Sequence, residues 1–331
     1  MDFQLTEDQK ALREGLRSFC EGRVPADQLP ELEKSGGIDR SLWSELAEMG
    51  VFGLRVAEAD GGVGLGSADA VLVFCELGRR LIPGPIVWTH LAASLVEGAT
   101  TGDCIVGGID LAGSDSRVLL VEQLEHIDKL LAVKPEGVFL IDSSEISGEP
   151  VPTPLDPLTP LHEVSDLPAG EQVGGPSDAR RLRLEGAALI SGQQLGIAEA
   201  TLELANEYAK EREQFGQVIG AFQAVKHMLA DMFVRQEVAR AAAYAAGATL
   251  DDPDVGDLQR AVSSAKLTAG EAALKNAKTC IQVHGGMGYT WEVPAHYYLK
   301  RAWLFESLFG TGEEHAEQVA QCVEQATQAA L

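Results

Sequence analysis

Apolar side chains recur at helical spacing near the start of the chain. Over residues 5–24, Leu12, Leu16 and Phe19 are separated by three or four positions, and such positions share one face of an α-helix. The same spacing over residues 39–49 predicts a second helix, and an apolar run over 67–81 predicts a third. The first hundred residues are therefore expected to be mostly helical.

The pattern changes near Cys104. From there to about residue 177, short apolar runs alternate with glycine, proline and aspartate, and prolines crowd residues 150–168. Short runs bounded by turn residues are typical of β-strands. We expect a small β-domain of fewer than eighty residues in this part of the chain.

Helical spacing returns at about Asp178 and persists to the end. Further helices are expected over 221–246, 258–283, 296–309 and 314–330. The pattern thus predicts a mainly α fold with a small β-domain. It divides the chain into a helical domain (1–103), a reduced β-domain (104–177) and a helical bundle (178–331).

The net negative charge of the chain disfavours negatively charged macromolecules as partners. Its 331 residues carry a formal net charge of -24, which repels nucleic acid and anionic lipid and favours solubility. No segment is long and apolar enough to span a bilayer, so we expect no membrane partner. Five cysteines lack any spacing typical of a metal site, which favours buried free thiols in a reduced cytoplasm.

Two stretches carry side chains suited to binding an anionic ligand. Arg212, Phe215 and Gln223 lie at the junction of two predicted helices. There an arginine can donate paired hydrogen bonds to phosphate, and an aromatic ring and an amide can hold a planar ring or a ribose. The plainer interpretation is a helix end with a solvated arginine and a packed phenylalanine.

The second stretch is "QVHGGMGYT". Gln282 is followed by Gly285, Gly286 and Gly288, and glycine lets a backbone pass close to a ligand because it has no Cβ. The plainer interpretation is a glycine that ends a helix. His284 is expected to have a structural rather than a catalytic role.

Both stretches, together with "LWSELAEMGVFGLRVAEADGGVGLGSADAVLVFCELGR", resemble the acyl-CoA dehydrogenase family. The resemblance covers the two helical regions. It implies an N-terminal helical domain, a middle β-domain and a C-terminal four-helix bundle. It also implies an FAD enzyme that oxidises the Cα–Cβ bond of acyl-CoA thioesters. In this family a glutamate removes the α-proton, and the β-hydrogen leaves as hydride to the flavin.

The resemblance assigns five residues to FAD. In dimers of the family, the equivalents of Arg212, Phe215, Gln223, Gln282 and Gly286 reach the FAD of the neighbouring subunit. All five are present in this chain. We call them the lending residues.

Two other motifs of the family are altered. The middle-domain segment that covers the flavin in the family is matched only in part by "GIDLAGSDSR", which retains Ala-Gly-Ser-Asp but lacks Thr-Glu-Pro. At the position of the usual base stands Phe309, which cannot accept a proton. The stretch from Arg301 to Gly310 is one residue shorter than the family pattern. Glu306 is expected to point elsewhere or to face a partner, and the acids at 313–314 are expected to begin a helix.

Some family members carry the base on the first helix of the bundle. Anchored on Leu195–Gly196, that position corresponds to Gly186. Glu185 lies one residue away, which is about 100° of rotation on a helix. It remains a rival candidate, beside the plainer interpretation that it is a surface acid.

These features predict a subunit that lends residues to FAD while a related partner supplies the base. The resemblance extends to actinobacterial α2β2 enzymes that act on steroid side-chain CoA thioesters. It implies an acyl-CoA substrate, an electron-transfer acceptor and a place in lipid and steroid catabolism. Two alternatives stay open: a self-sufficient dehydrogenase that uses Glu185, and a flavin-free scaffold or acyl-CoA-binding protein.

Overall fold

The computed structural model describes residues 4–36, 38–112 and 118–330. The chain forms two compact units, each assembled from separate stretches. The bundle unit comprises Met1–Asp27, Val71–Ile82 and Ala188–Leu331, and the sheet unit comprises Gln28–Ala70 and Pro83–Ala187. The expected mainly α fold with a small β portion is confirmed, while the three-domain division stays a prediction.

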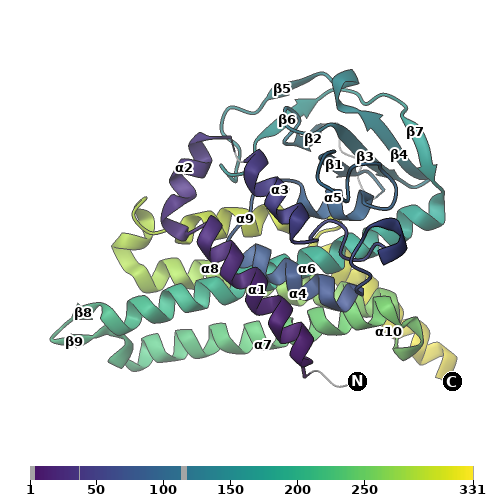
Figure 1. Cartoon of the computed structure of the whole chain (residues 1–331). Helices are drawn as coiled ribbons and strands as arrows, with labels where there is room; N and C mark the ends of the chain where they lie inside the picture. Colours follow the sequence, from purple (N-terminus) through teal and green to yellow (C-terminus); the bar gives the residue numbers. More distant parts are fainter. Residues whose placement is uncertain (1–3, 37, 113–117, 331) are drawn as a thin grey trace. The chain divides into compact units, whose positions relative to one another are not determined.

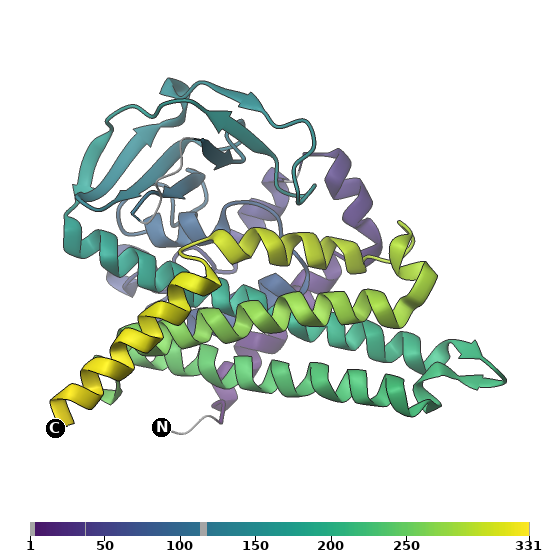
Figure 2. The same ribbon diagram turned by 180° about the vertical axis from the view of Figure 1, so that it is seen from behind.

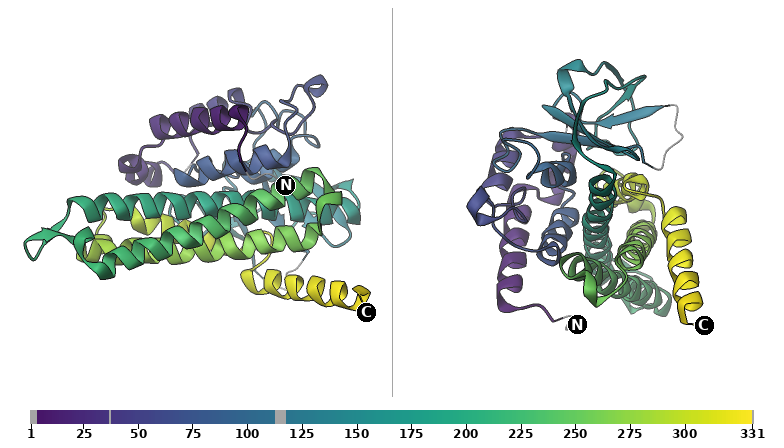
Figure 3. Two further views of the ribbon diagram at one scale, coloured as in Figure 1. Left: turned by 90° about the horizontal axis from the view of Figure 1, so that it is seen from below. Right: turned by 90° about the vertical axis from the view of Figure 1, so that its right-hand side faces the viewer.

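The bundle unit is helical. Its helices are α1 (Glu7–Arg23), most of α4 (Ser67–Arg79), most of α6 (Pro176–Glu211), α7 (Gln223–Asp251), α8 (Leu258–His284), α9 (Ala295–Ser307) and α10 (Gly312–Ala330). The long helices α6, α7 and α8 run side by side, and α10, drawn in yellow, diverges from them (Figures 1 and 3). A capping box at Thr6 begins α1, because its hydroxyl accepts a hydrogen bond from the Gln9 backbone.

A buried amide ties the three long helices together. Asn276 of α8 donates hydrogen bonds to the carbonyl oxygens of Ala198 in α6, at 3.3 Å, and Met232 in α7, at 3.0 Å. Its own side-chain oxygen accepts a hydrogen bond from Arg235 of α7 at 3.0 Å. A buried amide with its partners satisfied fixes the relative register of the helices around it.

Glycines let α4 and α6 cross closely within the bundle unit. A Cβ on Gly196 of α6 would overlap the carbonyl oxygen of Cys75 in α4, and one on Gly78 of α4 would overlap that of Gln193. Only a residue without a Cβ allows this backbone-to-backbone approach. The crossing therefore depends on these two positions.

Buried charges surround this crossing. Glu76 of α4 and Glu199 of α6 are almost fully buried, and each accepts contacts from arginine. The pairs are Arg17–Glu76 (2.8 Å), Arg79–Glu76 (3.3 Å), Arg79–Glu199 (3.0 Å) and Arg240–Glu199 (2.7 Å). Cys75 also lies near both carboxylates. Because arginines already neutralise these carboxylates, the cluster is an ion-pair network rather than a metal site.

The sheet unit combines short helices with two small sheets (Figure 2). Its helices are α2 (Leu29–Lys34), α3 (Arg40–Glu48) and α5 (Ile86–Ala92), and its strands are β1 (Val106–Asp110), β2 (Leu119–Glu122), β3 (Lys129–Lys134), β4 (Gly137–Asp142), β5 (Gly148–Pro150), β6 (Leu161–Val164) and β7 (Glu171–Gly174).

The strands follow the orders β1-β3-β4-β7 and β2-β6-β5. The β1–β3 pair is parallel, with Val106 opposite Lys129, and the other pairs are antiparallel. Helix α5 packs on β1, where a Cβ on Gly108 would overlap the ring of Trp88.

Several expectations need correction. Helix α7 continues to Asp251, and α9 ends at Ser307, so Phe309 lies in a turn and not in a helix. Cys20, Cys75 and Cys280 are buried free thiols, but Cys104 and Cys322 are partly exposed. Within the described ranges, every helix is too short or too polar to cross a bilayer.

The crossing of α4 and α6 makes a stability prediction. We expect Gly196→Ala to lower the free energy of unfolding by roughly 3 kcal/mol, because the added methyl overpacks a backbone contact. Gly15→Ala is the matched control, since a Cβ there meets no atom within 4 Å, and it should raise stability by about 0.5–1 kcal/mol. Urea unfolding of both variants measures this. Equal midpoints would contradict the close approach.

Candidate functional site

The structure places the five lending residues at one end of the bundle unit. Arg212 directly follows α6, and Phe215 caps a hairpin formed by β8 (Glu213–Gln214) and β9 (Gln217–Val218). Gln223 begins α7, Gln282 lies in the last turn of α8, and Gly286 lies in the 3₁₀ turn η6 (Gly285–Tyr289). Figures 1 and 2 show the hairpin and the connection from α8 to α9 at the same end of the long helices.

An apolar cluster holds this end together. Its buried members come from α6, α7, α8, the start of α9 and the segment before it: Ala205, Ala209, Met232, Cys280, Val283, Val293 and Ala295. Ile219 and Met287, from the two connecting segments, pack against it. The ring of Tyr208 stacks on that of His284 at 4.2 Å, and His284 bonds the Cys280 carbonyl at 2.8 Å. His284 is thus structural.

All five lending residues are exposed to solvent. Among the residues that the structure describes, the side chains of Arg212, Gln223 and Gln282 make no hydrogen bond or ion pair. A guanidinium group and two amides without partners at this end of the bundle unit are available to bind an external group. The arginine stands out because the chain as a whole is strongly acidic.

The Phe215 side chain is held outward by a strained turn. Phe215 and Gly216 form the two-residue loop of the hairpin, with φ of 53° and 80°. Two positive φ values are typical of a type I′ turn, in which asparagine and glycine are usual. Phe215 is 92% exposed, so the interpretation as a packed phenylalanine is wrong. An aromatic residue in this conformation costs about 1–2 kcal/mol.

The three glycines after Gln282 have different roles. Gly285 ends α8 with φ of 59°, as the plainer interpretation expected. A Cβ on Gly288 would lie 2.5 Å from the Ile281 carbonyl oxygen, whereas a Cβ on Gly286 would meet no atom within 4 Å. The fold therefore requires glycine at 285 and 288. At Gly286 it leaves open space that a ligand could approach.

The usual base position is sealed by packing. Phe309 is 2% exposed, with φ of 56°, and its carbonyl accepts a hydrogen bond from His315 at 3.0 Å. The buried Lys266 ammonium donates to the carbonyl oxygens of Phe305 (2.9 Å), Glu306 (3.2 Å) and Gly310 (3.2 Å). These contacts fix the turn between α9 and α10.

The acids around that turn support the backbone. Glu306 accepts a hydrogen bond from the Gly312 amide at 3.0 Å, and Glu314 accepts one from the Thr311 amide at 2.8 Å. Glu313 and Glu314 lie in the first turn of α10, where negative charge favours a helix start. The expectation that they begin a helix is confirmed.

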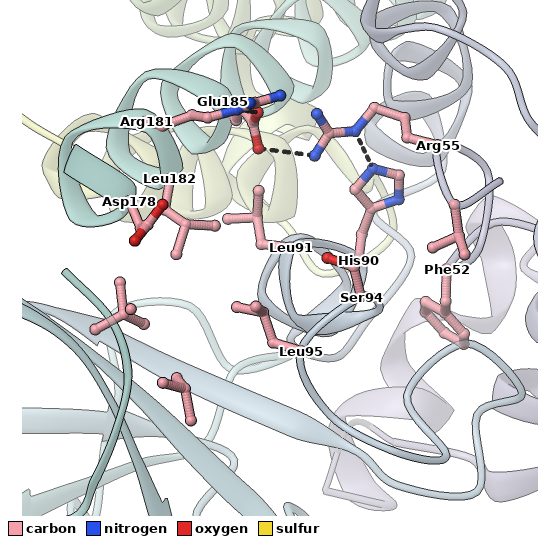
Figure 4. A pocket seen from close by; sticks show the side chains of 14 residues that line it. Phe52, Arg55, His90, Leu91, Ser94, Leu95, Asp178, Arg181, Leu182 and Glu185 are labelled. Atoms are coloured by element: carbon pink, nitrogen blue, oxygen red, sulfur yellow. Dashed lines mark hydrogen bonds and ion pairs between the residues drawn. The ribbon is translucent and has the colours of Figure 1, made fainter. Parts of the chain in front are cut away.

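Glu185 lines a cavity of about 420 Å³ in the sheet unit (Figure 4). One oxygen accepts a hydrogen bond from Arg55 at 3.0 Å and the other from Arg181 at 2.7 Å. Glu185 is 7% exposed, so the interpretation as a surface acid is wrong. Figure 4 shows the carboxylate between the two guanidinium groups, with Leu91, Leu95 and Leu182 on the apolar wall.

A neutral histidine orients Arg55. His90 donates from Nδ1 to the Val51 carbonyl at 2.8 Å, so its Nε2 accepts a hydrogen bond from Arg55 at 3.0 Å. Burial, with a smaller contribution from Arg55, lowers the pKa of His90 to about 3. His90 therefore holds one edge of the guanidinium while the other edge faces Glu185.

The two arginines make Glu185 a weak base. Burial acts to raise the pKa of its carboxyl, but attraction and hydrogen bonds from Arg55 and Arg181 outweigh burial and lower the pKa overall. A general base works best when its pKa lies near the operating pH. Both carboxylate oxygens are also occupied. The arrangement suits an ion pair better than proton abstraction.

Sequence patterns did not single out Arg55, His90, Arg181 or Lys266. Arg181 and Glu185 are four residues apart, a spacing that pairs opposite charges on a helix, and this signal was available. Arg55 lies 130 positions from Glu185, so no local pattern joins them. The Gly-Ser-Asp part of "GIDLAGSDSR" lies outside the described residues.

Comparisons with known proteins agree across the chain. Family models match the N-terminal domain of acyl-CoA dehydrogenases at residues 6–101 and their C-terminal domain at 180–323. Acyl-CoA dehydrogenase IpdE2 of Mycobacterium tuberculosis is 33% identical over 301 residues, covering 89% of this chain and 91% of IpdE2. Acyl-CoA dehydrogenase FadE34 of the same organism is 33% identical over 323 residues, covering 90% of this chain. The chain spans 45% of FadE34.

A solved structure shares the fold. The crystal structure of the ChsE4–ChsE5 complex from Mycobacterium tuberculosis contains a chain that superposes with a TM-score of 0.86. The match covers 98% of this chain and 99% of that one, at 24% identity. Identity at this level supports the architecture alone.

The depressed pKa of His90 predicts a pH dependence. Because the folded pKa of about 3 lies below the ordinary 6.5, the unfolded chain binds more protons between these values. Stability should thus be complete above pH 6.5 and fall as the pH drops toward 3. We expect a loss of about 2 kcal/mol between pH 7 and pH 5 that is absent in His90→Gln. Urea midpoints at the two pH values measure it, and parallel losses in both proteins would refute it.

The ion pairs of Glu185 predict a structural role. Glu185→Gln leaves the partly buried Arg55 without its counter-charge, so we expect a loss of about 2 kcal/mol in stability. Flavin content and turnover of the enzyme should stay within about twofold of wild type, because a weak base contributes little. Loss of turnover in a variant that keeps its flavin would instead identify Glu185 as the base.

Proposed function

Because this chain belongs to the acyl-CoA dehydrogenase family, a family of oxidoreductases, we propose that it is the FAD-lending subunit of a heteromeric enzyme. Arg212, Phe215, Gln223, Gln282 and Gly286 hold part of an FAD that a related partner subunit carries. The partner supplies the catalytic base. The enzyme forms an α,β-unsaturated acyl-CoA.

The observation that carries this proposal is the exposed end of the bundle unit. It presents polar side chains without partners, an aromatic ring held outward and an open glycine. These groups fit FAD. A guanidinium group matches the diphosphate, amides match ribose and ring edges, and the space at Gly286 admits close approach of the dinucleotide.

Bound flavin supplies the hydride-accepting chemistry of the reaction. The residues of this chain bind and orient it: Arg212 neutralises phosphate charge, and Phe215 covers apolar surface. Neither position considered for a base favours proton removal here. Phe309 has no titratable group, and both oxygens of Glu185 are engaged by arginines. The α-proton is therefore taken by the partner subunit.

We propose an α2β2 heterotetramer in the cytoplasm, with the chain divided at 1–103, 104–177 and 178–331. The substrate is an acyl-CoA, in particular a steroid side-chain CoA thioester, and electrons pass to an electron-transfer acceptor. Support comes from the sequence resemblance and from relatives described as acyl-CoA dehydrogenases, together with a fold neighbour solved as a two-component complex.

The test measures flavin per chain in two preparations. The chain purified alone should be colourless, because it holds only the lent half of the site. Co-expression with each longer acyl-CoA dehydrogenase chain of the same genome should yield one complex with bound FAD that bleaches on addition of acyl-CoA. Stoichiometric FAD and turnover in the chain alone would overturn the proposal. Complexes without flavin would favour the scaffold alternative.

The glycines of η6 provide a matched pair of variants. Gly286→Ala should fold normally but lower FAD affinity of the complex by about tenfold or more, because its methyl fills the approach to the ligand. Gly288→Ala should lower the thermal midpoint of the chain itself, since its Cβ meets the Ile281 carbonyl. Arg212→Ala should cost about 10- to 100-fold in FAD affinity, the value of a charged hydrogen bond. Full flavin content in Gly286→Ala and Arg212→Ala complexes would remove the lending role.

A further inference from the structure

An exposed aromatic pocket lies next to the lending residues in the bundle unit. Tyr289, Trp291 and Trp303 are 85%, 65% and 40% exposed. They line a cavity of about 310 Å³ together with Ile281 and Leu299. Large aromatic side chains that stay exposed around one hollow are typical of binding surfaces.

Two lysines lie beside the tryptophan rings of the pocket. The Lys300 ammonium lies 5.2 Å from the ring centroid of Trp291, and that of Lys278 lies 5.8 Å from the ring centroid of Trp303. None of the residues that line the cavity is acidic, although the chain has 50 acidic residues. Glu292 is the exposed acid beside Trp291 in sequence. The pocket is thus apolar with a basic rim.

Contacts within the chain support the ring of Trp291 on one side. Its ring meets that of His296 edge-on, with centroids 4.7 Å apart and an interplanar angle of 88°. His296 in turn bonds the Val293 carbonyl through Nδ1 at 3.0 Å. An exposed aromatic group held in one orientation loses little entropy when a partner covers it.

The pocket is continuous with the lending end. Tyr289 closes η6, the turn that contains Gly286, and Ile281 directly precedes Gln282. A subunit whose flavin approaches Gly286 must therefore also lie beside the pocket. Its surface there must bring apolar groups to the aromatic rings and negative charge to the two lysines.

We propose that this pocket is the docking anchor for the partner subunit: it receives an apolar side chain flanked by carboxylates on the related acyl-CoA dehydrogenase chain. The inference rests on the proposed function and adds the groups that hold the two subunits together. Buried tryptophan and tyrosine at the centre of an interface carry much of its binding energy. Lys278 and Lys300 select an acidic partner surface over a second copy of their own basic rim.

The test uses the complex that co-expression identifies, with its two chains purified and remixed. We expect Trp291→Ala combined with Trp303→Ala to weaken association by about tenfold or more. Lys278→Glu combined with Lys300→Glu should weaken it and reverse its dependence on salt. Lys275→Glu is the control, because Lys275 is exposed on the same helix and already pairs with Glu271. Unchanged affinity in both double variants would overturn the inference.

Tryptophan fluorescence gives a second reading. Trp43 and Trp88 are buried, whereas Trp291 and Trp303 are exposed. Acrylamide should therefore quench the fluorescence of Trp291 and Trp303 in the chain alone, and quench it less when the partner subunit covers them. Quenching that stays the same on binding would show that the pocket remains open and would refute the anchor, even if affinity fell. A pocket protected instead by a small molecule in the chain alone would refute it too.

The two proposals can fail separately. If Arg212→Ala loses flavin while the tryptophan variants bind the partner normally, the FAD-lending role is supported and the docking role of the pocket is refuted. If the tryptophan variants bind weakly but regain full flavin at saturating partner, both stand, because the pocket then acts on association alone. If no acyl-CoA dehydrogenase chain forms a complex with this one, both fall.

Discussion

The bundle unit depends on charges that are buried and paired. Glu76 and Glu199 lose their hydration at the crossing of α4 and α6. Ion pairs with Arg17, Arg79 and Arg240 replace the contacts with water that these carboxylates have lost. Removing one partner from such a network leaves an uncompensated charge, so the arginines and acids must be retained together. The network therefore joins α1, α4, α6 and α7 in one arrangement. Helices fixed in this way can carry strained and exposed groups at their far end.

The pairing of charges also separates structural from functional groups. Arg55 and Arg181 both form ion pairs with Glu185, and the buried Lys266 donates hydrogen bonds to three carbonyl oxygens. Arg212 differs, because it is exposed and its side chain has no partner among the described residues. A guanidinium group that the fold does not use is available for a ligand. This contrast favours binding at the end of the bundle unit over chemistry in the cavity around Glu185.

Local patterns in the sequence predicted much of this arrangement. Spacing of apolar residues located the long helices. The motif resemblance grouped Arg212 with Gln282, and the structure places both at one end of the bundle unit, while their shared role in binding stays a prediction. The ends of α7 and α9 were missed because turn packing, not periodicity, sets them. The environment of Glu185 could not be predicted, since Arg55 is 130 positions away and long-range pairs leave no local signal. The exposure of the Phe215 side chain could not be predicted from the sequence either, because it depends on the geometry of the hairpin.

Two phenylalanines show how strain can distinguish a role. Phe215 and Phe309 both have φ near 55°, a conformation that a bulky residue adopts only when its surroundings enforce it. For Phe309 the compensation lies within the chain, because its ring is buried and Lys266 and His315 hold its turn. The ring of Phe215 is almost fully exposed, and the ring of Phe222 lies edge-on to it with centroids 6.2 Å apart. Burial within this chain does not offset the strain at Phe215. In the proposed complex, the flavin and the partner subunit supply the contact that covers this ring.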